Sequence, residues 1–317
     1  MIRFPRSLVV SVLAAVVVLT AGALPALAKS STVSTTGNDI AWPQCGGSYP
    51  VGQAFGIVGV NHGLANNLNS CLPSELSWAA KSTPSNALPK GFPTAALYVN
   101  TADPGSVVPV VHDWPTNYVD PNVDPNGVSE SPASANADPY GPCTETATGS
   151  NTPACAWQYG WNRAIQDMLW LIATAPSGVS NLPSAYWWWL DVETGNTWES
   201  GTSGLANNVA ALRGMVAALK STGETVTVTG SVVSLGGVTN VGIYSTSYQW
   251  GQITDSSAVG YPDLVGVGGL PDWIPGARTL SGAQANCSLA GFTTMLGAGP
   301  TITQWFGKPY DGDVACP

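Results

Sequence analysis

Charged side chains are scarce in this chain. Only 9% of its 317 residues are Asp, Glu, Lys or Arg, and 10 Lys and Arg stand against 19 Asp and Glu, a formal net charge of −9. Such a chain repels the phosphate backbone, so we expect no nucleic-acid partner. There are 2 histidines, His62 and His112, and no C-x-x-C motif or Cys/His pair at ligand spacing. We therefore expect no metal site.

Long apolar runs are also absent after the first residues. The chain opens with Arg3 and Arg6, continues as an apolar segment over 8–23 and reaches A-L-A at 26–28. This pattern is typical of a secretory signal peptide cleaved near Ala28. The mature protein is therefore expected to be secreted, with no membrane segment, and to act as a monomer.

The remaining sequence predicts one folded domain. We expect a signal peptide over 1–28, a flexible Ser/Thr-rich leader over 29–38 and a single domain over 39–317. No G-x-S-x-G motif is present, which argues against serine-nucleophile catalysis.

The cysteines follow the predicted cleavage point. An even number of cysteines in an exported chain favours three disulfides over a metal site. Proximity in the sequence favours three pairs: Cys45 with Cys71, Cys143 with Cys155, and Cys287 with Cys316.

The segment A-Y-W-W-W-L-D-V-E-T at 185–194 is the most informative stretch. Its uninterrupted apolar run predicts a strand buried on both faces. Because side chains alternate along a strand, Asp191 and Glu193 should project on the same side, about 6 to 7 Å apart at Cα. Repulsion between two such carboxylates raises one pKa, as a general acid requires. The alternative is a pair of solvated acids at a strand end.

Strands and helices are predicted to alternate along the chain, which indicates an α/β fold: an irregular (β/α)8 TIM-like barrel of about eight parallel strands. A long loop, 102–153, is predicted after the third strand. The predicted strands are 39–42, 55–62, 95–100, 186–191, 241–245, 264–268, 272–274, 301–305 and 311–316, with a further strand or hairpin over 225–233. The predicted helices are 74–81, with Ser74 as N-cap, 156–173, 205–220 and 281–287.

An ordered set of short segments resembles glycoside hydrolase family 25, the Ch-type lysozymes or N-acetylmuramidases, in particular its secreted actinobacterial members. The set comprises D-I-A at 39–41, L-D-V-E at 190–193, G-I-Y-S at 242–245, D-W-I at 272–274, T-Q-W at 303–305 and D-G-D-V at 311–314. The resemblance covers 39–316. It implies an irregular β/α barrel that cleaves β-1,4 bonds of peptidoglycan without a cofactor, with cell-wall polysaccharide as its partner.

The resemblance also implies roles for the acids. Glu193 would donate a proton to the glycosidic oxygen, and Asp191 would position the substrate or stabilise positive charge in the transition state. Asp39 matches the family's N-terminal acid. The family's last acid corresponds to Asp313 in one alignment and to Ala315 in the other.

The chain departs from the family pattern at Pro43, at Gln44 and in the inserted segment 102–153. Two alternative functions follow. One is a catalytically inactive barrel that binds cell-wall glycan. The other is a chitinase-like hydrolase, although the strand before Asp191 lacks that family's additional acids.

Aromatic residues near the predicted strand ends are candidates for stacking against sugar rings. They are Trp42, Tyr98, Tyr244, Trp273 and Trp305, of which Tyr244 and Trp305 are favoured. The alternative is that these rings fill the barrel core. His62 follows a strand and is a candidate for a hydrogen bond to substrate or for a structural role.

Overall fold

The structure of the chain is a computed structural model, described here for residues 35–105, 114, 137–143, 151–222, 225–228, 231–255, 270–288 and 299–317. The predicted signal peptide lies outside the described residues, as do most of the predicted inserted loop and the strand predicted at 264–268.

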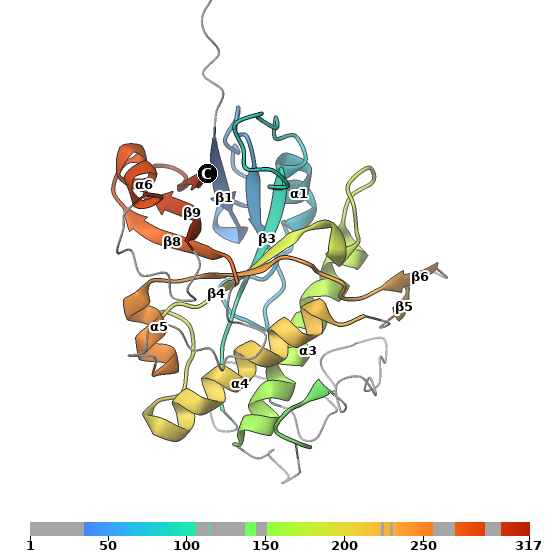
Figure 1. Cartoon of the computed structure of the whole chain (residues 1–317). Coiled ribbons are helices and arrows are strands. Elements are labelled where there is room, and N and C mark those ends of the chain that lie inside the picture. The colour runs from blue at the N-terminus through green and yellow to red at the C-terminus, as the bar shows by residue number, and fades with distance from the viewer. Residues whose placement is uncertain are drawn as a thin grey trace, which may run out of the picture. The chain divides into compact units, whose positions relative to one another are not determined.

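The predicted irregular TIM-like barrel is present. Eight strands close in the order β1-β10-β9-β8-β7-β4-β3-β2, with helices on the outside (Figure 1). The strands are β1 (Thr36–Ile40), β2 (Gly56–Gly59), β3 (Ala95–Asn100), β4 (Trp187–Asp191), β7 (Val241–Tyr244), β8 (Asp272–Ala277), β9 (Pro300–Trp305) and β10 (Gly312–Ala315). The described helices are α1 (Leu72–Ala79), α3 (Pro153–Thr174), α4 (Gly201–Lys220), α5 (Ser247–Thr254) and α6 (Leu280–Asn286).

The last strand departs from the expected parallel order. β10 runs antiparallel to both of its neighbours, β9 and β1, whereas all other adjacent barrel strands are parallel. Only the short loop from Phe306 to Asp311 joins β9 to β10. A parallel connection needs a crossover of about a dozen residues or more, so this link forces a hairpin.

The first strand also begins earlier than predicted. Thr36 and Gly37 pair with Val314 and Asp313 of β10, so the end of the expected leader belongs to the barrel. The strand stops at Ile40 because a 3-10 turn over Trp42–Gln44 follows it.

Local signals explain where the helices begin. Thr152 caps α3 by accepting a hydrogen bond from the backbone N–H of Cys155. Ser74 does not cap α1, which starts two residues earlier, at Leu72; Pro73 suits its first turn. The prediction missed α5, a short helix capped by Thr246 and closed by Asp255 in the left-handed conformation.

The hairpin expected over 225–233 is present. β5 (Thr225–Val228) pairs antiparallel with β6 (Ser231–Ser234) as a separate two-stranded sheet.

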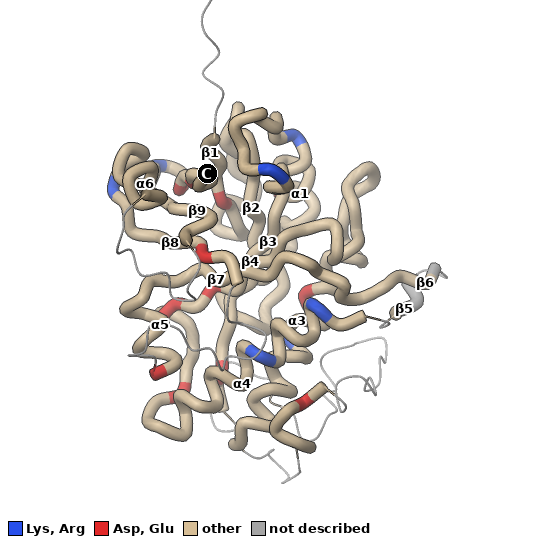
Figure 2. Tube along the Cα trace, in the orientation of Figure 1, with Lys and Arg blue, Asp and Glu red and all other residues tan. Residues whose placement is uncertain are grey.

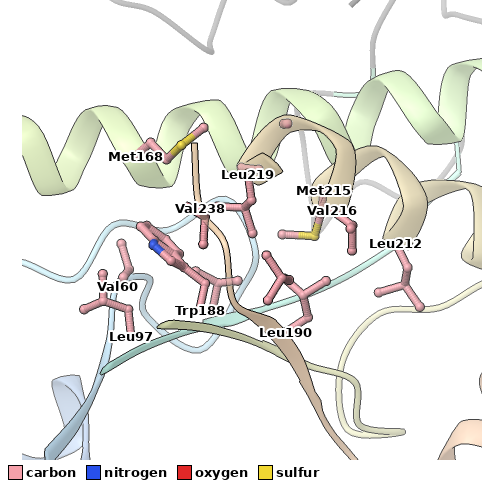
Figure 3. Close-up of a cluster of buried hydrophobic side chains, with 14 of the residues drawn as sticks. Val60, Leu97, Met168, Trp188, Leu190, Leu212, Met215, Val216, Leu219 and Val238 are labelled. Atoms are coloured by element: carbon pink, nitrogen blue, oxygen red, sulfur yellow. The ribbon is translucent and has the colours of Figure 1, made fainter. Parts of the chain in front are cut away.

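The two faces of β4 contribute to different cores. Trp188 and Leu190 point outward and pack under α3 and α4 with Leu212, Met215 and Leu219 (Figure 3). Trp189 belongs instead to a cluster inside the barrel. Asp191 follows the same alternation, which places the end of β4 in the barrel interior.

All three predicted disulfide pairings are confirmed. Cα–Cα distances are 5.6 Å for Cys45–Cys71, 4.5 Å for Cys143–Cys155 and 5.3 Å for Cys287–Cys316. None of the described helices has the length and apolar character needed to cross a membrane.

Two glycines allow α3 and α4 to pack backbone against backbone. A Cβ added to Gly160 of α3 would overlap the carbonyl of Ala211, and one added to Gly214 of α4 would overlap the carbonyl of Trp157. The contact supports the outer core that covers β4.

We expect Gly160→Ala to lower the free energy of unfolding by about 2 kcal/mol, because the two helix backbones must separate and this outweighs the better helix propensity of alanine. Urea unfolding followed by tryptophan fluorescence measures the change. Gly195→Ala is the control, since its Cβ meets nothing within 4 Å. Equal urea midpoints for Gly160→Ala and Gly195→Ala would contradict the close contact between the backbones of α3 and α4.

Candidate active site

Carboxyl groups from opposite sides of the barrel face one interior region. Asp39 lies on β1 and Asp313 on the adjacent β10, whereas Asp191 ends β4 across the barrel. The charge of Asp39 raises the pKa of both Asp191 and Asp313. The structure therefore brings together three acids that lie far apart in the sequence.

A chain of hydrogen bonds connects the interior residues. The Tyr244 hydroxyl donates to Gln304 Oε1 over 2.9 Å, and Gln304 Nε2 donates to Asp39 Oδ2 over 2.9 Å. The carboxyl groups of Asp39 and Asp313 hydrogen-bond to each other. Trp273 Nε1 donates to Asp313 Oδ1 over 2.9 Å. These contacts span five strands of the barrel: β1, β7, β8, β9 and β10.

The hydrogen bonds assign protons within this pair of acids. Burial raises the pKa of Asp39 to about 6, against the hydrogen bond from Gln304, which lowers it. Burial, followed by the charge of Asp39, raises the pKa of Asp313 well above its ordinary range. One carboxyl must donate when two share a hydrogen bond, so Asp313 holds the proton and Asp39 is the first to ionise.

Asp191 and Glu193 interact electrostatically, although β4 ends at Asp191 and Glu193 lies in the turn that follows. Asp191 is 7% exposed, and Val192 between them packs in the outer core. Burial raises the pKa of Asp191 well above its ordinary range, and the charge of Glu193 raises it further, followed by that of Asp39. Glu193 is only partly buried. The deeper member of the pair thus carries the tightly held proton.

The turn after β4 is held from several sides. Gln249 on α5 accepts a hydrogen bond from the backbone N–H of Thr194 over 2.7 Å and donates to Glu193 Oε1 over 3.4 Å. Trp198 Nε1 donates to the backbone carbonyl of Glu193 over 2.8 Å. Glu193 lies beyond the strand, so these contacts determine its position.

Three of the predicted aromatic residues line the interior. The Trp273 ring centroid lies 4.5 Å from that of Tyr244 and 6.2 Å from that of Tyr98. Trp273 is 2% exposed, so it forms a wall of the site and cannot stack on a sugar. Tyr98 and Tyr244 are partly exposed, and burial followed by the nearby carboxylates raises the pKa of each hydroxyl.

The structure turns Trp305 away from the acids. Because Gln304 points inward, Trp305 points outward, where it packs with Ala277 and Val314. His62 is partly buried, with its ring centroid 3.9 Å from that of Trp42.

Sequence reasoning missed Gln304 and Gln249. Gln304 lies within the T-Q-W segment, and the alternation of a strand ending at Trp305 would have indicated it once the register was known. Gln249 follows Thr246 by three residues in a short helix with little apolar periodicity. No local signal ties it to Glu193.

Among the described residues, no group of three or more His, Cys, Asp or Glu side chains has the arrangement of a metal site. The described groups that face the interior are carboxyl groups, two phenols and the amide of Gln304.

No protein-family model, curated protein or solved structure matches this chain.

The raised pKa of Asp39 predicts a pH dependence of stability. The folded protein binds this proton more tightly than the unfolded chain, so the stabilisation is complete below 3.8 and is lost as the pH rises to about 6. We expect Asp39→Asn, which keeps an acceptor for Gln304, to reduce this loss by about 2 kcal/mol. Urea unfolding from pH 4 to 7 measures it, and identical slopes for variant and wild type would contradict the assignment.

Gln304→Met should raise the pKa of Asp39 above about 6, because it removes the hydrogen bond that stabilises the ionised carboxylate. Carboxyl ¹³C NMR titration of Asp39 follows the change. Gln252→Met, an exposed position on α5, serves as the control. An unaltered or lowered pKa in Gln304→Met would show that this amide does not support the ionised form.

Proposed function

We propose that the chain is a secreted glycoside hydrolase that cleaves β-1,4 bonds in the N-acetylated glycan of bacterial cell walls. The observation that carries the proposal is the grouping of Asp39, Asp191 and Asp313 in one interior region, with Glu193 beside Asp191, and with the pKa of Asp39 raised to about 6 while the pKa values of Asp191 and Asp313 are raised well above their ordinary range. Glycoside hydrolysis needs such a set, because one carboxyl donates a proton while another stays ionised.

In this mechanism Glu193 donates the proton to the leaving oxygen. It is the most accessible acid of the pair and extends from a turn, whereas Asp191 lies deeper and is 7% exposed. The charge of Glu193 acts on Asp191, so the two carboxyls are close enough for the proton that Asp191 holds in the free protein to pass to Glu193 when substrate displaces water. Asp191 then gains negative charge as the sugar gains positive charge.

Asp39 supplies the second ionised group. Above about pH 6 it carries a charge that Gln304 stabilises. A carboxylate in this place either attacks the sugar, stabilises its positive charge or activates a water molecule. Asp313 supports it by donating a hydrogen bond from its neutral form.

Two phenols surround these acids. Tyr98 and Tyr244 pack against the cluster inside the barrel, and, after burial, the charges of Asp39 and Asp191 help to raise the pKa of Tyr98 while those of Glu193 and Asp191 do so for Tyr244. Tyr244 uses its proton for Gln304 and retains lone pairs for a sugar hydroxyl. These groups are suited to bind a neutral, hydroxyl-rich ligand.

The three disulfides support export, since such bonds persist in oxidising compartments. The signal-peptide pattern at the start of the sequence also supports export. A wall polysaccharide outside the membrane is a substrate that an exported enzyme can reach.

Release of soluble muropeptides and new reducing ends from purified peptidoglycan tests the proposal. Glu193→Gln should reduce release at least about a hundredfold, because an amide of the same shape has no acidic proton to donate. The variant should fold normally, since glutamine keeps an acceptor for Gln249.

Asp255→Asn, at an exposed left-handed position that asparagine tolerates, is the control and should retain activity. Equal release by Glu193→Gln and wild type would refute the role of Glu193. Pull-down on insoluble wall without release from the wild type would favour a barrel that only binds glycan.

A further inference from the structure

Among the described residues, no cation is one of the charges that act on the interior acids Asp39, Asp191 and Asp313. Every Lys and Arg after Lys29 belongs to the described residues, and none lies on a barrel strand (Figure 2). Arg163 and Arg213 lie within helices, and the exposed cations are Lys81, Lys90, Lys220, Arg278 and Lys308. The electrostatic influences on Asp191 come from Glu193 and Asp39, both acids.

Asp191 also presents an unused acceptor. Its Oδ1 atom is buried and has no hydrogen-bond partner among the described residues, although the side chain faces the other acids. Buried polar atoms are normally satisfied, so such an atom calls for a ligand that donates a hydrogen bond. The electrostatics of its surroundings favour a donor that carries positive charge.

We propose that this site selects its sugar by charge: it prefers a β-1,4 glycan whose bound residue carries a free, protonated amino group, and it disfavours a glycan with a free carboxylate there. The inference rests on the proposed hydrolase function and names the substrate class of the same site. The ammonium of a de-N-acetylated glucosamine would donate to Asp191 Oδ1, near Asp39, and both of these acids remain when Glu193 is replaced by glutamine.

Binding of this ammonium group is expected to release one proton from the site. The free site holds a proton on Asp191, with Tyr98, Tyr244 and Asp313 as the other protonated groups facing the region. When the ammonium arrives, Asp191 ionises and its proton leaves to solvent, while the amine keeps its own. A neutral N-acetyl group causes no such release.

The test is isothermal titration of Glu193→Gln, which lacks the proposed proton donor, with three tetrasaccharides at about pH 6, where the amine is protonated. They are β-1,4-linked glucosamine, β-1,4-linked N-acetylglucosamine, and alternating N-acetylglucosamine and muramic acid with a free lactyl carboxylate. We expect the glucosamine tetramer to bind about tenfold more tightly than the neutral one, and the carboxylated one to bind most weakly. The heat should vary with the ionisation enthalpy of the buffer only for glucosamine.

Asp191→Asn in the same background should remove the preference and the proton release, whereas Asp255→Asn should retain both. Equal affinities, a preference for the N-acetylated or carboxylated tetramer, no binding of any tetramer, or the same loss of preference in Asp255→Asn would each overturn the proposal.

This measurement requires no turnover. A protein that prefers glucosamine but releases no sugar refutes the hydrolase function alone. One that hydrolyses wall glycan while binding the three tetramers equally refutes the charge preference alone.

Discussion

Burial of carboxyl groups without a cation is the constraint on which this site depends. A buried, ionised carboxylate is costly unless it is paired, and the barrel strands contain no Lys or Arg. The protein resolves this by keeping protons on Asp191 and Asp313 and by giving Asp39 an amide donor from Gln304. Protonated carboxyl groups and an amide thus lower the cost of burial that an ion pair lowers in other proteins. The result is a set of acids with separated proton affinities, which a salt-bridged arrangement would not provide.

The aromatic filling of the barrel creates the low-dielectric surroundings that hold those protons. Glycines opposite the large rings make room for it: a Cβ on Gly59 would come 2.9 Å from Tyr98 Cζ, and one on Gly242 would overlap Trp189. An eight-stranded barrel has just enough interior for side chains. Filling it with rings buries the acids, and burial is the largest cause of the raised pKa of Asp191.

The sequence was most informative where periodicity was strong. The apolar run before Asp191 predicted a strand buried on both faces, and proximity in the sequence predicted the disulfides. Trp305 shows the limit. A one-residue difference in register exchanges the two faces of a strand, so its neighbour Gln304 points inward instead. The direction of β10 is set by the short loop that connects it to β9. The hydrogen bond between Gln249 and Glu193 depends on tertiary packing, which no local sequence pattern reveals.

The barrel interior and the elements outside it control different properties of the site. Strand residues set the charge, because Asp39, Asp191 and Asp313 are fixed by the sheet. Glu193 lies beyond β4, and its position depends on Gln249 of α5 and on Trp198. A shift of α5 would therefore move the proposed proton donor while the buried acids kept their protons. Catalysis is sensitive to displacements of about 1 Å. The short helix α5, which the sequence pattern missed, therefore controls the position of the proposed proton donor, whereas the barrel strands control the charge of the site.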